Sequence, residues 1–236
     1  MTTSALMSAI RNSLCGLSLL LLLLAGPLCS AQRRVSADVE VKQALAGKVV
    51  TVTKSVYCSG NGRLVIHFHT PEEMFVVTNP LGEARVYFPK TGKDNAGENI
   101  GLSSRDELLF LFLSVRVDDL GVTQDGYRLV STANEDGLLK KTFVSEKNGN
   151  LPRVEIVYQN YLPIYLAYLD PSGKAVNKTY FSNYSYFQRF VFPCRVTNIT
   201  YPSPRDSSVT RTLYSNLKVD VDDPLFDYDI PAAGGR

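Results

Sequence analysis

The sequence has few of the residues, and none of the local motifs, on which enzyme active sites are commonly built. Among its 236 residues are only two histidines and four cysteines. It contains no Gly-x-Ser-x-Gly elbow, no Cys-x-x-Cys pair and no glycine-rich loop that could cradle a phosphate. We therefore expect a protein that is not an enzyme, with no catalytic residues and no cofactor.

A strong excess of either charge is also missing. Lys and Arg together number 25 and Asp and Glu 23, so the formal net charge is +2. Proteins that bind nucleic acid through its phosphates usually carry a clear excess of basic residues. We expect no nucleic-acid partner.

The two histidines, His67 and His69, lie two residues apart in a stretch that predicts a strand. Alternate residues of a strand point to the same face, so both imidazoles could contact one metal ion. No third ligand is visible nearby in the sequence. We interpret the pair as side chains on a solvated face and expect no metal site.

The N-terminus has the pattern of a secretory signal peptide. Arg11 precedes an apolar run, Leu17–Ala25, which is shorter than the roughly 20 residues of a membrane-spanning helix. The pair Gly26-Pro27 ends the run, and small residues up to Ala31 follow. We expect residues 1–31 to be removed near Ala31, so that the protein is exported to the periplasm.

A lipoprotein signal is the alternative, with Cys29 as the lipidated residue. Leu28 stands directly before it, where such a signal has a small side chain. We therefore favour cleavage after Ala31, which leaves residues 32–236 as a single domain.

Two cysteines, Cys58 and Cys194, remain after this cleavage, in a compartment where disulfides persist. We predict that they pair with each other. The alternative is two buried free thiols that behave as small apolar side chains.

From Gly47 onward, short segments rich in Val, Thr, Tyr and Phe alternate with turn residues, which is typical of antiparallel strands. Asn61-Gly62 predicts a tight hairpin in which both residues have positive φ. About ten strands with short connections indicate a strongly curved sheet or a barrel. The predicted strands are Val50–Cys58, Arg63–His69, Glu73–Asn79, Ala84–Phe88, Tyr127–Thr132, Leu138–Ser145, Pro152–Gln159, Pro163–Leu169, Val176–Tyr186, Phe190–Tyr201 and Val209–Val219.

One segment interrupts the strands. Ser104–Glu107 fits a helix capping box, and the apolar run Leu108–Leu113 follows it. Leu109 to Val117 also alternate as a strand would, but the capping box favours a helix. A helix that is apolar on every side must be buried or covered by apolar groups.

Large apolar side chains occur on both faces of the strands from Val154 to Tyr168. A sheet with one face in water needs only one apolar face. Either a sandwich core or a helix covers the second face, or that face lines a cavity for acyl chains below Leu108–Leu113.

Three parts of the chain resemble the periplasmic outer-membrane lipoprotein carriers called LolA-like proteins. Gly60–Leu64, a strand that ends at Pro71 and the stretch Val86–Pro89 are similar to the opening hairpins of that family. The apolar segment lies where the family has its lid helices. The closing stretch Asp223–Pro231 is similar to its final signature.

The resemblance implies a mainly β fold: a half-open antiparallel β-barrel of about eleven strands with a helical lid. It implies a monomeric carrier without a cofactor. Such a carrier takes acylated lipoproteins or lipids from an inner-membrane release complex and passes them to an outer-membrane acceptor.

Two departures from the family concern the lid and the N-terminus. The family has an arginine near the end of the second strand that holds the lid shut, whereas this chain reads His67-Phe68-His69-Thr70 there. The stretch Val39–Ala46 is short for the family's N-terminal helix.

In the carrier interpretation, apolar strand residues line the concave face of the sheet and the helical segment covers it. The strands contribute Leu64, Ile66, Phe68, Phe75, Val77, Ile156 and Leu166, and the lid contributes Leu108, Leu109, Phe110, Leu111, Phe112 and Leu113. Two other functions fit the same barrel: transport of another lipid or glycolipid, and a sensing module for envelope stress that transports nothing.

Overall fold

The computed structural model describes residues 33–45, 47–94, 102–145, 147–187, 190–203 and 206–231. Gln32–Arg236 forms one compact unit. The predicted signal peptide, residues 1–31, lies outside the described residues. Within the described ranges, no helix is long and apolar enough to cross a bilayer.

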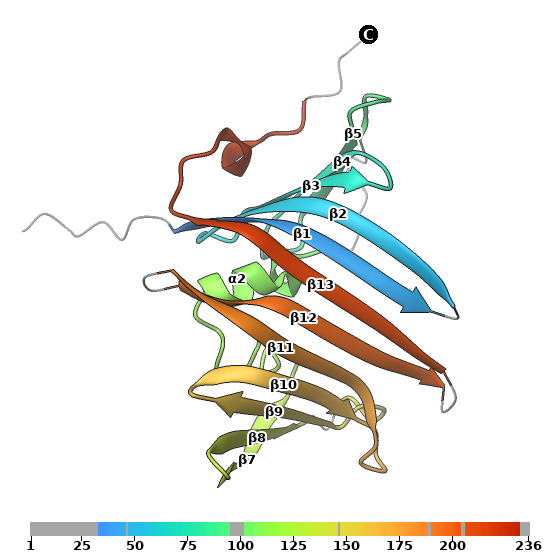
Figure 1. Ribbon diagram of the computed structural model, residues 1–236, viewed down its shortest axis with the longest axis vertical. Coiled ribbons are helices and arrows are strands. Elements are labelled where there is room, and N and C mark those ends of the chain that lie inside the picture. Colours follow the sequence, from blue (N-terminus) through green and yellow to red (C-terminus); the bar gives the residue numbers. More distant parts are fainter. Residues whose placement is uncertain are drawn as a thin grey trace, which may run out of the picture. The chain divides into compact units, whose positions relative to one another are not determined.

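Thirteen antiparallel strands form a single curved sheet (Figure 1). The order across the sheet is β6-β5-β4-β3-β2-β1-β13-β12-β11-β10-β9-β8-β7, and within the described residues the two outermost strands do not pair with each other. The sheet is therefore open, which confirms the mainly β, half-open antiparallel barrel. It has two strands more than the eleven that we expected.

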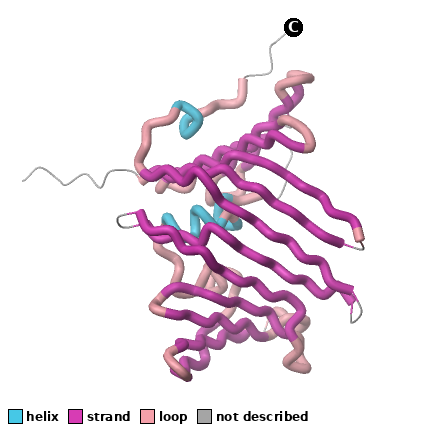
Figure 2. Tube along the Cα trace, viewed as in Figure 1, coloured by secondary structure: helices cyan, strands magenta, loops and turns pink. Residues whose placement is uncertain are grey.

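The first six strands are β1 (Arg34–Leu45), β2 (Lys48–Ser59), β3 (Leu64–Thr70), β4 (Met74–Thr78), β5 (Ala84–Phe88) and β6 (Lys93–Asp94). The remaining seven are β7 (Arg128–Glu135), β8 (Leu138–Val144), β9 (Arg153–Gln159), β10 (Leu162–Leu169), β11 (Ala175–Phe187), β12 (Phe190–Ser203) and β13 (Asp206–Val219). Figure 2 shows that helix is confined to short pieces between and after these strands.

Strand β1 was missed by the sequence prediction, which began the strands at Gly47. It pairs with both β2 and β13 and therefore lies in the middle of the sheet. Val35, Ala37 and Val39 are buried, whereas the residues between them point to the other face. The segment compared with a helix of the LolA-like family is thus a strand up to Leu45.

The hairpin at Asn61-Gly62 is present between β2 and β3, but its geometry differs from the prediction. Only Gly62 has a positive φ, of 87°. The Gly62 amide donates to the Ser59 carbonyl at 2.8 Å. A Cβ atom on Gly62 would lie 2.1 Å from Cγ of Pro80 and 3.2 Å from Cζ of Phe110. The turn therefore needs glycine both for its conformation and for the close approach of its neighbours.

The predicted helix is confirmed as α2 (Leu108–Leu113). The predicted capping box is wrong. Ser103 caps a preceding 3₁₀ turn, η1 (Ser104–Asp106), and its Oγ accepts from the Arg105 amide at 3.2 Å. Glu107 is the N-cap residue of α2 but makes no side-chain cap bond, because its carboxylate points toward the sheet.

The stretch Asp223–Pro231, called the C-terminal segment below, includes the short turn η2 (Pro224–Asp227). Its aromatic side chains pack on the sheet. The ring of Phe226 lies 5.4 Å from that of Tyr57 on β2, and the ring of Tyr228 lies 4.3 Å from that of Phe75 on β4. Tyr57 alternates with the buried core residues Val56 and Cys58, so the C-terminal segment covers the face opposite the core.

Candidate functional site

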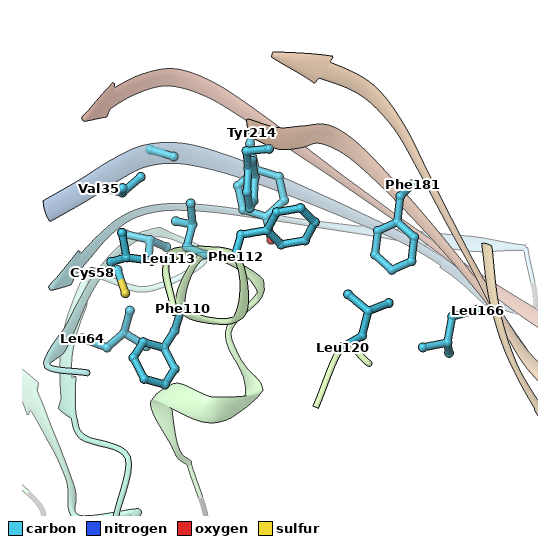
Figure 3. Packing of buried hydrophobic residues seen from close by; sticks show 14 of the residues in the cluster. Val35, Cys58, Leu64, Phe110, Phe112, Leu113, Leu120, Leu166, Phe181 and Tyr214 are labelled. Atoms are coloured by element: carbon cyan, nitrogen blue, oxygen red, sulfur yellow. The ribbon is translucent and has the colours of Figure 1, made fainter. Parts of the chain in front are cut away.

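The face of the sheet toward which the core side chains point is called the α2 face here. It carries one continuous apolar cluster, to which α2 itself belongs. Figure 3 shows side chains of α2 together with those of the central strands. The strand members include Val35, Val56, Leu64, Val76, Phe143, Ile156, Leu166, Phe181 and Phe192.

Four of the six residues of α2 are buried in this cluster: Leu109, Phe110, Phe112 and Leu113. The ring of Phe112 lies edge-on to that of Phe192 at 5.2 Å, and Phe192 lies edge-on to Tyr214 at 4.8 Å. Leu108 and Leu111 are only partly buried. The helix thus covers the central strands with its own apolar side chains.

A part-buried polar cluster holds the start of the helix against the sheet. Nζ of Lys54 on β2 donates to Oε2 of Glu107 at 3.3 Å, and the Tyr214 hydroxyl on β13 donates to Oε1 of Glu107 at 3.4 Å. The side chains of Lys54 and Glu107 are only 16 % and 12 % exposed. The Lys54 ammonium also lies 5.7 Å from the ring of Phe68. We call Lys54, Glu107 and Tyr214 the Glu107 cluster.

Burial sets the protonation of the groups around this cluster. Desolvation, with a smaller contribution from the Glu107 charge, raises the pKa of Tyr214 well above its usual range. The same two causes raise the pKa of the Cys58 thiol. Both groups therefore stay protonated at neutral pH. Loss of Lys54 would leave the part-buried Glu107 charge without a counter-ion in the closed state, which destabilises that state.

The chain that follows α2 has an unusual backbone. Val115 has a φ of 59° and Leu120 a φ of 50°, although neither residue is glycine. A β-branched residue such as Val115 rarely adopts this left-handed conformation. Its side chain is 71 % exposed, so core packing does not hold it in place. Backbone strain is thus present directly after the helix, at Val115.

Most of the residues predicted to form the site lie together on the α2 face. Leu64, Ile66, Ile156 and Leu166 are buried members of the apolar cluster, and Phe68 packs against it. From the lid, Leu109, Phe110, Phe112 and Leu113 are buried members and Leu108 packs against them. Leu111 is half-buried and would lie 3.3 Å from a Cβ atom on Gly121.

Phe75 and Val77 were expected on the same face, and this expectation is wrong. Phe75 stacks on His67 at 4.0 Å and on Tyr228 of the C-terminal segment. Val77 pairs with Val65 and lies two residues from Phe75, so it shares that face. The residue of β4 that belongs to the core is Val76, one position away.

The prediction missed the Glu107 cluster and the contribution of β1. The alternation of Val35, Ala37 and Val39 with polar residues was a usable signal for β1. No pattern in the sequence pairs Lys54 with Glu107, because they are 53 positions apart and meet only when α2 folds over the sheet.

The predicted Cys58–Cys194 disulfide is also wrong, because both cysteines are free. β1 and β13 lie between β2 and β12, so the two cysteines are three strand spacings apart, about 14 Å along the sheet. A disulfide requires Cα atoms within about 7 Å. The Cys194 thiol instead donates to Oγ of Ser185 at 3.2 Å.

His67 and His69 do share one face, and their ring centroids are 4.4 Å apart. Nε2 of His67 lies 3.4 Å from Oε1 of Glu73, and Nε2 of His69 lies 2.9 Å from Oγ of Ser55. Among the residues that the structure describes, no three His, Cys, Asp or Glu side chains are grouped as metal ligands. Burial, and secondly the neighbouring His69, lower the pKa of His67.

Sequence comparison finds no protein-family model and no curated protein that matches this chain. Solved structures of other proteins share its fold. A DUF1329 family protein from Desulfovibrio piger is 18% identical, with a TM-score of 0.55 over 84% of this chain and 90% of that chain. A LolA superfamily protein from Nitrosomonas europaea is 16% identical, with a TM-score of 0.55 over 83% and 90%.

Another structure with this fold is a putative outer membrane lipoprotein-sorting protein domain from Vibrio parahaemolyticus. It is 12% identical to this chain, with a TM-score of 0.54 over 82% of this chain and 89% of that chain. At these identities the likeness is one of fold, and it extends over most of the chain in each case.

Proposed function

We propose that this chain, which has the LolA-like fold, is a periplasmic carrier that holds acyl chains of lipoproteins on its α2 face and delivers them toward the outer membrane. The observation that carries the proposal is the apolar helix α2, which covers a continuous apolar sheet face in this fold. The protein acts by binding and catalyses no reaction.

Three features of α2 favour its displacement from the sheet by a bound acyl chain. A helix of six residues is far too short to be stable by itself, so its conformation depends on the sheet below it. Its N-cap residue lacks a side-chain cap bond, and its C-terminal end leads into the strained Val115. An acyl chain can replace the apolar contacts that α2 makes, because these contacts require no specific partner.

Competition with α2 would also make release feasible. Burial of acyl chains is worth about 0.8 kcal/mol per methylene, so a permanently open cavity would hold its cargo too tightly to pass it on. If cargo must first displace α2, the net affinity is lowered by the free energy of opening. The contacts within the Glu107 cluster then contribute to the free energy of opening. In the family, an arginine near the end of the second strand has this role.

The route follows from the proposed location. Residues 1–31 would direct export and be removed near Ala31. An inner-membrane release complex would load the protein, and an outer-membrane acceptor would unload it. The likeness to an outer membrane lipoprotein-sorting domain supports this route.

Removal of the Lys54 charge tests the proposal. The probes are the neutral dye N-phenylnaphthylamine and a palmitoylated peptide, with protein purified from the periplasm. Lys54→Met leaves Glu107 unpaired in the closed state, so both probes should bind about tenfold more tightly. Lys42→Met is the control, because Lys42 pairs with Glu40 at 2.9 Å in an exposed ion pair, and it should change nothing.

Two results would count against the carrier. If neither probe binds the wild-type protein or Lys54→Met, the α2 face is not a lipid site. If Lys54→Met loses its cooperative thermal transition, α2 is fixed core and does not open.

A further inference from the structure

Along the long strands β11, β12 and β13, the side chains on the α2 face change from apolar to uncharged polar. On β12, Phe192 belongs to the apolar cluster and Val196 packs against it. The next two positions on the same face are polar, Asn198 and Thr200. The change is abrupt and occurs within one strand. It divides the α2 face into an apolar part under α2 and a polar part beyond it.

The strand register shows that the polar side chains share this face. Thr179 on β11 lies opposite Leu166 of the core, and Asn198 lies opposite Thr179 on the other side. Most of the side chains are half-buried, and Gln43 is exposed. We call them the polar strip, and its members are Gln43, Asn177, Thr179, Asn198, Thr200, Ser208 and Thr210.

Hydrogen bonds hold the amides and hydroxyls of the polar strip in fixed orientations. Nδ2 of Asn198 donates to Oδ1 of Asn177 at 3.0 Å and to Oγ1 of Thr179 at 2.9 Å. Oγ1 of Thr200 donates to Oδ1 of Asn198 at 3.0 Å. Asn is unfavourable in strands, so two paired Asn residues in neighbouring inner strands need another explanation than strand stability.

The two faces of these strands differ in charge. The opposite face carries several charged side chains, among them Lys42 with its partner Glu40, Lys178, Arg195 and Arg211. On the α2 face, the described positions from Val196 to Thr200 and their cross-strand partners carry no charge. A surface that only meets water has no reason to exclude charged side chains.

We infer that the polar strip binds the uncharged, hydroxyl-rich head of a neutral glycolipid whose acyl chains occupy the apolar part of the α2 face. This inference rests on the acyl-chain site of the proposed function and adds a neutral glycolipid to the cargo that this site takes. Amides and hydroxyls each donate and accept hydrogen bonds, as sugar hydroxyls do. A charged head would lose its hydration against the strip without gaining a counter-ion.

The dimensions agree with a head of one or two sugar rings. Four residues along a strand cover about 13 Å, and the three strands β11 to β13 span about 10 Å. The strip adjoins Leu166 and Val196, so an acyl chain attached to the head would pass directly onto the apolar cluster.

The test compares three amphiphiles that have the same dodecyl chain: dodecyl maltoside, dodecyl phosphate and dodecyltrimethylammonium, each below its critical micelle concentration. Displacement of N-phenylnaphthylamine from protein purified from the periplasm gives their affinities. Dodecyl maltoside should bind about tenfold more tightly than the two charged compounds. Asn198→Val should abolish this preference and leave dye binding unchanged, because about two hydrogen bonds are lost.

The control is Thr197→Val, which changes the neighbouring residue on the opposite face of the same strand and should leave the preference intact. Thr179→Val provides a second variant of the strip should Asn198→Val fold poorly. If all three amphiphiles displace the dye equally, or if the strip variants keep the preference, the inference is wrong while the carrier proposal stands. If no amphiphile displaces the dye, both are wrong.

Discussion

The two faces of the sheet are covered by short segments that are held in different ways. On one face, α2 contributes apolar side chains and its start is anchored through the part-buried Glu107 cluster. On the other face, the C-terminal segment combines apolar packing with several separate polar contacts. Both covers bury a phenylalanine, Phe112 in α2 and Phe226 in the C-terminal segment.

The polar contacts of the C-terminal segment come from two arginines. Nη2 of Arg34 donates to Oδ2 of Asp227 at 3.0 Å, and its guanidinium lies 5.4 Å from the ring of Phe226. Nη2 of Arg63 donates to the Tyr228 carbonyl at 2.6 Å and to Oδ1 of Asp229 at 2.8 Å. These contacts have defined partners and directions.

The difference separates a fixed cover from a replaceable one. An acyl chain can substitute for the apolar contacts of α2, but it cannot replace the hydrogen bonds of Arg34 and Arg63. We therefore expect α2 to open in a local equilibrium and the C-terminal segment to detach only when the whole sheet unfolds.

Phe226→Ala should destabilise the protein by about 3–5 kcal/mol, the usual cost of removing a fully buried phenylalanine. Its side chain is 1 % exposed in the structure. Urea denaturation followed by circular dichroism measures the change. Tyr186→Ala is the control, because Tyr186 is 69 % exposed and its loss should cost less than about 0.5 kcal/mol. Equal costs for the two variants would show that the C-terminal segment is not a fixed cover.

Gly62→Ala should cost about 2–4 kcal/mol, whereas Gly82→Ala should cost about 1 kcal/mol. Both glycines have positive φ, 87° and 82°. Only at Gly62 would a Cβ atom collide with Pro80 and press against Phe110 of α2, since nothing lies within 4 Å at Gly82. The two variants in the same urea assay separate backbone strain from the clash. Similar costs would mean that the turn relaxes away from α2.

Phe112→Ala and Phe112→Glu should cost the same, about 2 kcal/mol or less. Once α2 has opened, the identity of residue 112 no longer affects stability, so the cost cannot exceed the free energy of opening. Both variants should keep a cooperative thermal transition and bind N-phenylnaphthylamine more tightly than the wild type. If Phe112→Ala costs as much as Phe226→Ala and Phe112→Glu does not fold, α2 is as fixed as the C-terminal segment.

The smallest effect concerns His67. Its ring stacks on Phe75 of β4, and Phe75 stacks in turn on Tyr228 of the C-terminal segment. Burial and His69 lower the pKa of His67 in the folded state, so folding favours its neutral form. The contribution of His67 to the free energy of unfolding should be fully present above its pKa in the unfolded chain, about 6.5. It should be lost as the pH falls through the lower pKa of the folded state. Urea titrations at pH 7.5 and 5.5 measure this loss. His67→Gln should reduce it, and an unchanged loss would assign it to other groups.

The sequence predicted the strands well because alternation and turn residues are local signals. Ala84–Phe88 agrees with β5 at both ends, and most other strands agree within a few residues. The face of each strand was harder to predict. Phe75 and Val77 were placed on the wrong face because β4 is short and apolar on both sides, and one side is covered by Tyr228, about 150 positions later in the chain.

The candidate site was predictable where it is made of one continuous apolar run. Phe110 and Phe112 are buried as expected, since a helix without a polar face must be covered. The Glu107 cluster was not predictable, because its members come from β2, β13 and the start of α2. The sequence resemblance pointed to an arginine that this chain lacks at the end of β3, and the lysine that contacts the start of α2 lies on the neighbouring strand β2.

Hydrogen exchange during ligand binding follows α2 and the C-terminal segment in one experiment. The protein is exchanged with and without saturating dodecyl maltoside, and mass spectrometry compares peptides from residues 104–116 with peptides from residues 223–231. If α2 is a displaceable cover over the lipid site, the ligand should accelerate exchange in residues 104–116 and leave residues 223–231 unchanged. Bound ligand that leaves exchange in residues 104–116 unchanged, or slows it, would show that α2 is not displaced.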